Sequence, residues 1–218
     1  MKKTALVALT VLFITITSVA QSPKVKFGIH AGTSIANMKY EEDEYSYSPK
    51  SIFGIQGGFV ADLQLSKHLS LQPGVNFVQK GMKIKSDEGG SNDKYSERIN
   101  SIEVPLNILF NSNIGSGNFF VGAGPTVSFA LGGKYTEEYG GETDKGNLEF
   151  GNDEMDDDYR ALDFGLNGMI GYEFKGGFFM AANYNIGLRN LMPGEDEDYG
   201  KVKTNYVGLR LGYFFNRK

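Results

Sequence analysis

The sequence predicts an all-β protein, an eight-stranded antiparallel up-and-down transmembrane β-barrel. Three observations lead to this fold class. Eight segments alternate apolar and polar residues with a period of two, which is typical of strands with two different faces. One face of each segment lacks charged residues. The connections between the segments alternate between long and short along the chain, as in barrels whose two ends face different compartments.

The strands follow from the alternation, and no segment shows the 3.6-residue period of an amphipathic helix. We expect strands at residues 24–38, 51–64, 69–85, 98–111, 118–131, 159–174, 178–191 and 201–216. Pro73, Pro105 and Pro125 fall inside three of these segments. Because proline cannot donate a hydrogen bond to the ladder, each predicts a bulge or local irregularity, beyond which the face assignment can slip.

The first face of the strands carries large apolar side chains and no charge, although charged residues make up 22% of the chain. A charge that faces lipid at mid-depth costs about 2–4 kcal/mol, which explains this exclusion. The face therefore predicts a wall in contact with hydrocarbon. It includes Phe27, Ile29, Phe53, Phe59, Val75, Ile108, Val127, Phe164, Met180, Leu209 and Tyr213.

The opposite face is small or polar and suits the narrow interior of a small barrel. Besides many glycines and asparagines it carries balanced charges, which must be paired if they are buried. We expect a polar network in the lumen formed by Lys26, Asp62, Lys80, Glu103, Asp163, Glu173, Arg189 and Arg210, centred on Asp62, Glu103, Arg189 and Arg210. The alternative is a soluble barrel of lipocalin type with its apolar face inward, but a solvated outer face would not need so many glycines.

The acidic residues separate the two ends of the barrel. The short connections are residues 65–68, 112–117 and 175–177, and the long ones are 39–50, 86–97, 132–158 and 192–200. Of 26 Asp and Glu residues, four lie on the lumen face and the other 22 in the long connections. The long connections also hold tyrosines that we expect to contact a partner: Tyr45, Tyr47, Tyr135, Tyr139 and Tyr199.

The acidic run that ends in Asp156, Asp157 and Asp158 offers weak candidates for a metal site. It lacks the spacing of an EF-hand calcium loop, and a solvated run of charges is the simpler interpretation. The sequence therefore predicts at most weak binding of divalent cations there.

Residues 1–20 have the features of a secretory signal peptide. Lys2 and Lys3 precede an uncharged apolar run, and Ser18 and Ala20 supply small residues at the two positions that a signal peptidase reads. The alternative, a membrane-anchor helix, needs about 20 apolar residues, and the run is shorter. We expect cleavage before Gln21, a barrel domain at residues 21–218 and a location in the outer membrane.

Composition excludes several classes of function. The absence of cysteine excludes disulfide scaffolds, thiolate metal sites and cysteine catalysis. A net charge of −4 provides no basic footprint for nucleic acid. The two histidines do not suggest a catalytic base, since His30 lies mid-strand on the lumen face and His68 in a short turn. Without a catalytic or phosphate-binding motif we expect no enzyme and no cofactor.

Several segments resemble, in order, the PorT-like outer-membrane β-barrel family: KFGIHAGTSIANM at 26–38, GIQGGFVADLQLSKHLSLQPGVNFVQKG at 54–81, IEVPLNIL at 102–109, FVGAGP at 120–125, DFGLNGMIGYEF at 163–174, NYNIGLRNL at 183–191 and VGLRLGYFF at 207–215. The resemblance spans essentially the whole mature chain, and EVPL with the upstream LQPGVNFVQKG is its most distinctive part. It implies an eight-stranded barrel similar to OmpA and OmpX, with no catalytic motif to carry over. One departure is that Asn216-Arg217-Lys218 follow the terminal aromatics Tyr213 and Phe215.

The function that we expect is structural, with acidic extracellular loops displayed for surface interactions. Outer-membrane lipid is one partner, and divalent cations or an envelope or extracellular protein bind at the loops. Two alternatives stay open: an accessory component of an envelope secretion or transport machine, and a membrane-embedded enzyme. A diffusion pore is excluded, because side chains fill the interior of an eight-stranded barrel. The sequence leaves the specific partner and the oligomeric state undetermined.

Overall fold

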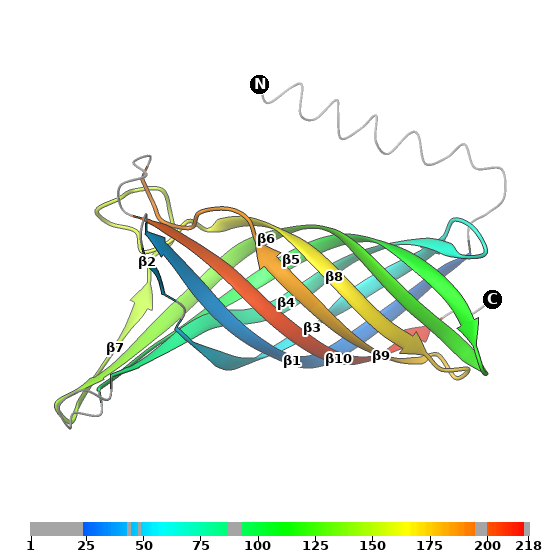
Figure 1. Ribbon diagram of the computed structural model, residues 1–218, viewed down its shortest axis with the longest axis horizontal. Coiled ribbons are helices and arrows are strands. Elements are labelled where there is room, and N and C mark those ends of the chain that lie inside the picture. Colours follow the sequence, from blue (N-terminus) through cyan, green and yellow to red (C-terminus); the bar gives the residue numbers. More distant parts are fainter. Residues whose placement is uncertain (1–23, 43–44, 48, 87–92, 195–199, 216–218) are drawn as a thin grey trace, which may run out of the picture.

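The computed structural model describes residues 24–42, 45–47, 49–86, 93–194 and 200–215, and these residues form ten strands and no helix (Figure 1). The strands are β1 (Val25–Glu42), β2 (Tyr45–Tyr47), β3 (Lys50–Gln64), β4 (Leu69–Ser86), β5 (Asp93–Ile114), β6 (Gly117–Tyr139), β7 (Glu142–Leu148), β8 (Leu162–Glu173), β9 (Phe178–Gly187) and β10 (Lys201–Phe215). The predicted signal peptide and Tyr199 lie outside the described residues.

Eight of the strands form a closed antiparallel ring, which confirms the predicted fold class. The ring runs β1, β3, β4, β5, β6, β8, β9, β10, and β10 pairs back with β1. Closure leaves no unpaired edge inside a bilayer, where an unsatisfied backbone group would be costly. The two remaining strands, β2 and β7, extend β1 and β6 beyond the ring. Within the described residues, no helix is long and apolar enough to cross a membrane.

At the end with the long connections, the predicted strands were too short in β5 and β6 and too long in β8 and β9, which end at Leu162 and Gly187 there. The expected strands 98–111 and 118–131 are parts of β5 and β6, which reach Asp93 and Tyr139. The predicted long connection 132–158 therefore contains the end of β6 and all of β7. Outward apolar residues stop at Leu131, but backbone pairing continues because inward side chains of these strands still pack in a buried cluster around Met82, Ile99 and Leu148.

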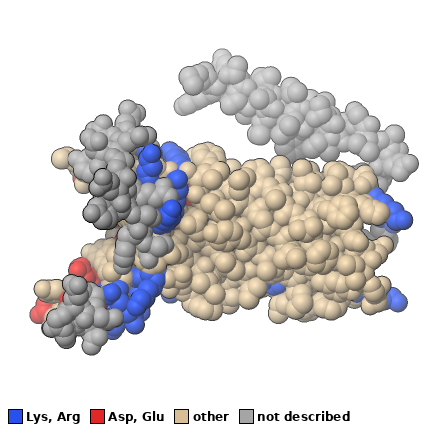
Figure 2. Space-filling model, viewed as in Figure 1, with Lys and Arg blue, Asp and Glu red and all other residues tan. Residues whose placement is uncertain are grey.

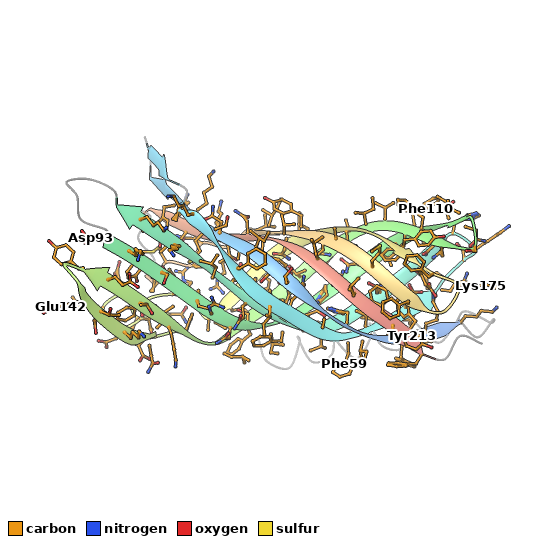
Figure 3. The ribbon with its side chains drawn as sticks, turned by 90° about the horizontal axis from the view of Figure 1, so that it is seen from below. Phe59, Asp93, Phe110, Glu142, Lys175 and Tyr213 are labelled. Carbon is orange, nitrogen blue, oxygen red and sulfur yellow. The ribbon has the colours of Figure 1, made fainter. Side chains whose placement is uncertain are left out.

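The predicted apolar face points outward. Phe59 is 69% exposed and Phe53 is 64% exposed. Figure 2 shows a wall of uncharged surface along the barrel, with Lys and Arg at both of its ends. Figure 3 shows labelled Phe59 and Phe110 projecting from this wall. Since one side chain in two points outward, the wall presents a continuous apolar band to lipid.

The lumen is less polar than predicted in the half near the short turns. Phe120, Phe179 and Phe214 point inward and pack with Leu109 and Met169. The glycines on this face make room for the rings. A Cβ at Gly171 would collide with the Phe120 ring, and a Cβ at Gly212 would collide with the Phe179 ring.

The three prolines do not shift the strand register. Pro73 pairs with Leu106 and Asn76 with Glu103, which is the same register on both sides of Pro73. The register is likewise unchanged across Pro105, Pro125 and their partners. The irregularities lie elsewhere: Asn100 pairs with Gly132 but Ser101 with Ala130, so Leu131 is an extra residue in β6, and a second shift falls between Ser51 and Gln56. The prediction of slippage at the prolines was wrong, because proline tolerates the β region and loses only one donor.

Candidate functional site

A buried ion network lies in the middle of the lumen. The Lys80 ammonium lies 3.3 Å from the Glu103 carboxylate and 3.9 Å from the Asp163 carboxylate. It also donates to the Ser128 hydroxyl at 3.2 Å. These side chains come from β4, β5, β6 and β8, so the network connects half of the ring across the lumen.

Strand β10 completes this network with two hydroxyl donors. Tyr206 donates to Glu103 Oε1 at 2.7 Å, and Thr204 donates to Asp163 Oδ2 at 2.9 Å. Both carboxylates are buried, with Glu103 1% exposed. A buried carboxylate is tolerated when a cation and hydrogen-bond donors compensate it, and both carboxylates have each kind of partner.

Asp62 and Glu173 lie away from this centre, at the end of the lumen near the short turns. Lys26 pairs with Glu173 at 2.6 Å, and Ser70 donates to Asp62 at 3.3 Å. Both carboxylates line a cavity of about 400 Å³ together with Lys67 and Lys175. The predicted charged set is therefore divided into a mid-lumen group and a group at this mouth.

The prediction that Asp62 and Arg189 share the centre of this network is corrected, whereas Arg210 is buried in the lumen and attracts Glu103. Arg189 follows the end of β9, donates to the Leu162 carbonyl at 2.9 Å and stacks on the outward-facing Phe164 ring, so it lies outside the lumen. Arg210 is buried in the lumen, where its Nη2 contacts the Met169 sulfur at 3.4 Å. The alternation breaks at Arg189 because regular pairing of β9 ends at Gly187.

A further buried carboxylate, Glu97, lies beyond the membrane wall at the other end of the barrel. The Tyr95 hydroxyl donates to it at 2.5 Å and the Tyr159 hydroxyl at 2.8 Å, and Tyr159 meets Tyr40 at 3.0 Å. Outward apolar residues stop at Ile102 on the same strand, so this tyrosine-carboxylate cluster (Tyr40, Tyr95, Glu97 and Tyr159) lies beyond the hydrocarbon. Burial raises the pKa of Glu97 and raises the pKa of Tyr40 to about 12.

Glu97 was predicted to be one of the acidic residues in a long connection, and this cluster was not predicted. The signal was available, because Tyr95, Glu97 and Ile99 continue the inward alternation of Ser101 and Glu103. The outward apolar residues end at Ile102, and the predicted strand therefore began at Arg98 and did not include Glu97. A strand that continues beyond the membrane keeps its two faces but no longer needs an apolar outer one.

The tyrosines that were expected to contact partners differ in their surroundings. Tyr139 is 71% exposed at the end of β6, next to the β6–β7 turn. Tyr135 is partly buried and stacks on Tyr95 with ring centroids 6.3 Å apart. Tyr45 and Tyr47 form the ends of β2, and their side chains, like all of Tyr199, are outside the described residues.

The acidic run at residues 153–158 folds into a turn that uses its own carboxylates. Asp157 accepts a hydrogen bond from the Asp153 amide at 2.8 Å, and Asp158 accepts one from the Glu149 amide at 2.8 Å. Asp156 is exposed. In the part of the chain that the structure describes, no group of three His, Asp or Glu residues could hold a metal ion. Asp157 and Asp158 thus stabilise this turn.

The two histidines occupy different environments. His30 is buried in the lumen, and its Nε2 lies 2.9 Å from Asn76 Oδ1. His68 lies exposed in the β3–β4 turn and stacks on Phe110. A histidine acting as a general base in a triad needs a carboxylate on one ring nitrogen and a nucleophile near the other, whereas the described side-chain partner of His30 is an amide.

Comparison with known proteins agrees with this architecture. Residues 19–192 match the family model described as outer membrane protein beta-barrel domain. The chain belongs to this family. It is a protein of the outer membrane.

Similar folds occur among solved structures. The attachment invasion locus protein Ail of Yersinia pestis is 14% identical, with a TM-score of 0.40 over 88% of this chain and 99% of that chain. Neisserial surface protein A is 13% identical, with a TM-score of 0.41 over 87% and 97%. The N-terminal barrel domain of Pseudomonas aeruginosa OprF is 12% identical, with a TM-score of 0.36 over 85% and 97%. No curated protein matches the sequence.

Proposed function

We propose that this protein is a non-catalytic surface-interaction barrel that presents the β6–β7 hairpin to partners outside the cell. The observation that carries the proposal is the hairpin itself. It extends beyond the membrane wall, where Figure 3 labels Glu142. Glu137, Glu142 and Asp144 are exposed, as is the ring of Tyr139. An aromatic ring flanked by carboxylates is a contact surface that suits a cationic protein or bridging divalent cations.

The filled lumen supports an interaction role over transport of solutes. Aromatic residues occupy the periplasmic half, the Lys80 network the middle, and the cluster around Met82, Leu148 and Tyr159 the extracellular mouth. An eight-stranded ring has an interior just wide enough for such side chains. The described barrel therefore serves as a rigid anchor for what it displays.

A second candidate function is an accessory component of an envelope secretion or transport machine. The periplasmic cavity of about 400 Å³ favours it. Lys24, Lys26, Lys67 and Lys175 line this cavity, and they exceed the two carboxylates Asp62 and Glu173 there. A basic mouth of this kind suits an acidic periplasmic segment of a partner.

Site-specific photo-crosslinking in intact cells distinguishes the two functions. A photoreactive phenylalanine analogue replaces Tyr139 at the extracellular hairpin or Ile114 at the periplasmic β5–β6 turn. The surface role predicts crosslinks from position 139 that weaken in about 1 M salt, where the screening length falls to about 3 Å. It also predicts their loss in Glu137→Gln/Glu142→Gln. Crosslinks from position 114 alone would support the secretion role and contradict the surface role.

A further inference from the structure

Four basic side chains gather at the extracellular border of the lipid-facing wall. They are Lys50 of β3, Lys83 of β4, Arg98 of β5 and Lys134 of β6, on four neighbouring strands. We call this group the basic shelf. Figure 2 shows Lys and Arg side chains in a belt between the uncharged wall and the loops. The shelf begins where outward apolar residues end, at Phe53, Phe77, Ile102 and Leu131.

The strand register places like charges directly opposite each other in the shelf. Arg98 is the cross-strand partner of Lys134, and Lys50 is the partner of Lys83. Arg98 and Lys134 are both exposed and lie beside the inward-facing Glu97 and Gly133, so they point outward. Like charges that face each other across two strands are destabilising, and a bound anion removes that cost.

Carboxylates of the described chain do not compensate the shelf at its own level. The other outward positions in these cross-strand rows are Gln79, Ser96, Asn100 and Thr136, together with Gly81 and Gly132. The next acidic side chain along the described outer face is Glu138, which pairs with Lys94 at 2.6 Å and also attracts Lys83, so this one carboxylate is shared between two cations. The positive charge of the shelf is therefore in excess.

Arg98 is held in position for an acceptor by two amide side chains. Its Nη1 donates to Gln79 Oε1 at 3.1 Å, and Gln79 Nε2 donates to Asn100 Oδ1 at 3.0 Å. This chain of bonds keeps the guanidinium beside Gln79 and Asn100, the cross-strand pair that forms the first polar row above Ile102. A guanidinium has five N–H donors, and its fork matches the geometry of a phosphate group.

We propose that the basic shelf binds the phosphate of an outer-leaflet lipid headgroup. The shelf is continuous with the surface that already contacts lipid chains, so an anion bound there can keep its acyl chains along Phe53, Phe77 and Ile102. A soluble anion has no acyl chains and would make no such contacts with the apolar wall. Lys39 of β1 and Lys203 of β10 also pair across strands at this end, but both have other interactions, and the proposal rests on the shelf alone.

Native mass spectrometry of the purified full chain in detergent tests the proposal, with phosphatidic acid as the probe and diacylglycerol as the phosphate-free control. We expect retention of phosphatidic acid but not of diacylglycerol. Arg98→Gln/Lys134→Gln should lower the affinity about 25-fold, since each basic residue near an anionic lipid surface contributes a factor of about five. The matched control Lys67→Gln/Lys175→Gln removes the same charge in the periplasmic turns and should retain the lipid.

Two further measurements protect the test against misfolding and against a soluble ligand. Heat-dependent gel mobility reports whether each variant folds, and Arg98→Lys/Lys134→Arg, which keeps both charges, should retain most of the binding. If Arg98→Gln/Lys134→Gln fails to fold, Lys83→Gln replaces it, with an expected loss of about fivefold. Equal binding by the shelf variants and the wild type, equal loss in the control variant, or displacement of the lipid by millimolar inorganic phosphate would overturn the proposal.

Discussion

Two buried carboxylates, Glu103 in the middle of the lumen and Glu97 at the end with the long connections, are compensated in different ways. Glu103 has the Lys80 ammonium at 3.3 Å and one tyrosine hydroxyl, from Tyr206. Glu97 has two tyrosine hydroxyls, from Tyr95 and Tyr159. Both side chains are almost fully buried. Glu103, where hydrocarbon surrounds the barrel, thus has a cation in addition to a neutral donor, whereas the hydrogen bonds that Glu97 accepts from side chains beyond the hydrocarbon come from two neutral donors.

This difference has a physical reason. Inside the membrane-spanning ring, the medium around the lumen is protein and lipid, and an uncompensated charge there costs several kcal/mol. Beyond the wall, water surrounds the extended strands, and a neutral, protonated Glu97 is an accessible alternative to the ionised form. The raised pKa of Glu97 means that its protonated, neutral form is favoured relative to that of a solvated glutamate.

The largest expected effect comes from removing the cation. Lys80→Met leaves Asp163 and Glu103 buried without the ammonium that forms an ion pair with each, and breaking a buried pair in this way costs about 3–5 kcal/mol. Urea unfolding of the barrel in lipid vesicles measures the change. The double variant Lys80→Met/Glu103→Gln should recover part of the loss, and a loss of less than about 1 kcal/mol in Lys80→Met would break the comparison.

Matched removals of one hydroxyl sharpen the comparison. Tyr206→Phe should destabilise the barrel by about 1.5–3 kcal/mol, the range for a hydrogen bond to a charged group. Tyr159→Phe should cost about 1 kcal/mol, because Tyr95 still donates to Glu97. The unfolding assay used for Lys80→Met ranks the two variants, and the reverse order would contradict the idea that ionised Glu103 depends on its donors.

The pH dependence of stability separates the two carboxylates further. Because burial raises the pKa of Glu97 above its ordinary value of 4.5, the folded state binds a proton more tightly than the unfolded state. The contribution of Glu97 is therefore most favourable below pH 4.5 and is lost as the pH rises through its folded pKa. Urea midpoints between about pH 4 and pH 8 should fall more steeply for the wild type than for Glu97→Gln. Parallel curves would contradict the raised pKa.

The smallest effect is expected at the hairpin tip. Tyr139→Ala should change the free energy of unfolding by less than about 0.5 kcal/mol, because Tyr139 is 71% exposed and an exposed side chain contributes little. Thermal unfolding followed by gel mobility suffices for this comparison. A larger loss would mean that the hairpin packs on the barrel through Tyr139 and is less available to partners than we propose.

The barrel could be predicted from local patterns because the alternation of apolar and polar residues within each strand distinguishes its two faces. The alternation around Phe53 or Leu209 identifies the lipid side without any knowledge of neighbouring strands. The candidate sites were predicted less completely. The sequence indicated that Lys80, Glu103 and Asp163 face inward, but it did not show that they meet, and it placed Arg189 on the wrong face because the alternation was continued beyond the end of β9.

The sequence by itself determined the ring of strands, the apolar outer surface and the location in the outer membrane. These features depend on side-chain periodicity and on the free-energy cost of placing a charge in hydrocarbon. Only the tertiary structure decided which residues face each other. Register and closure bring Tyr206 of β10 to Glu103 of β5, and Arg98 of β5 beside Lys134 of β6. A bulge such as the one at Leu131 shifts the cross-strand partners by one residue. The position of such a bulge depends on how whole strands pair, so no single segment of the sequence reveals it.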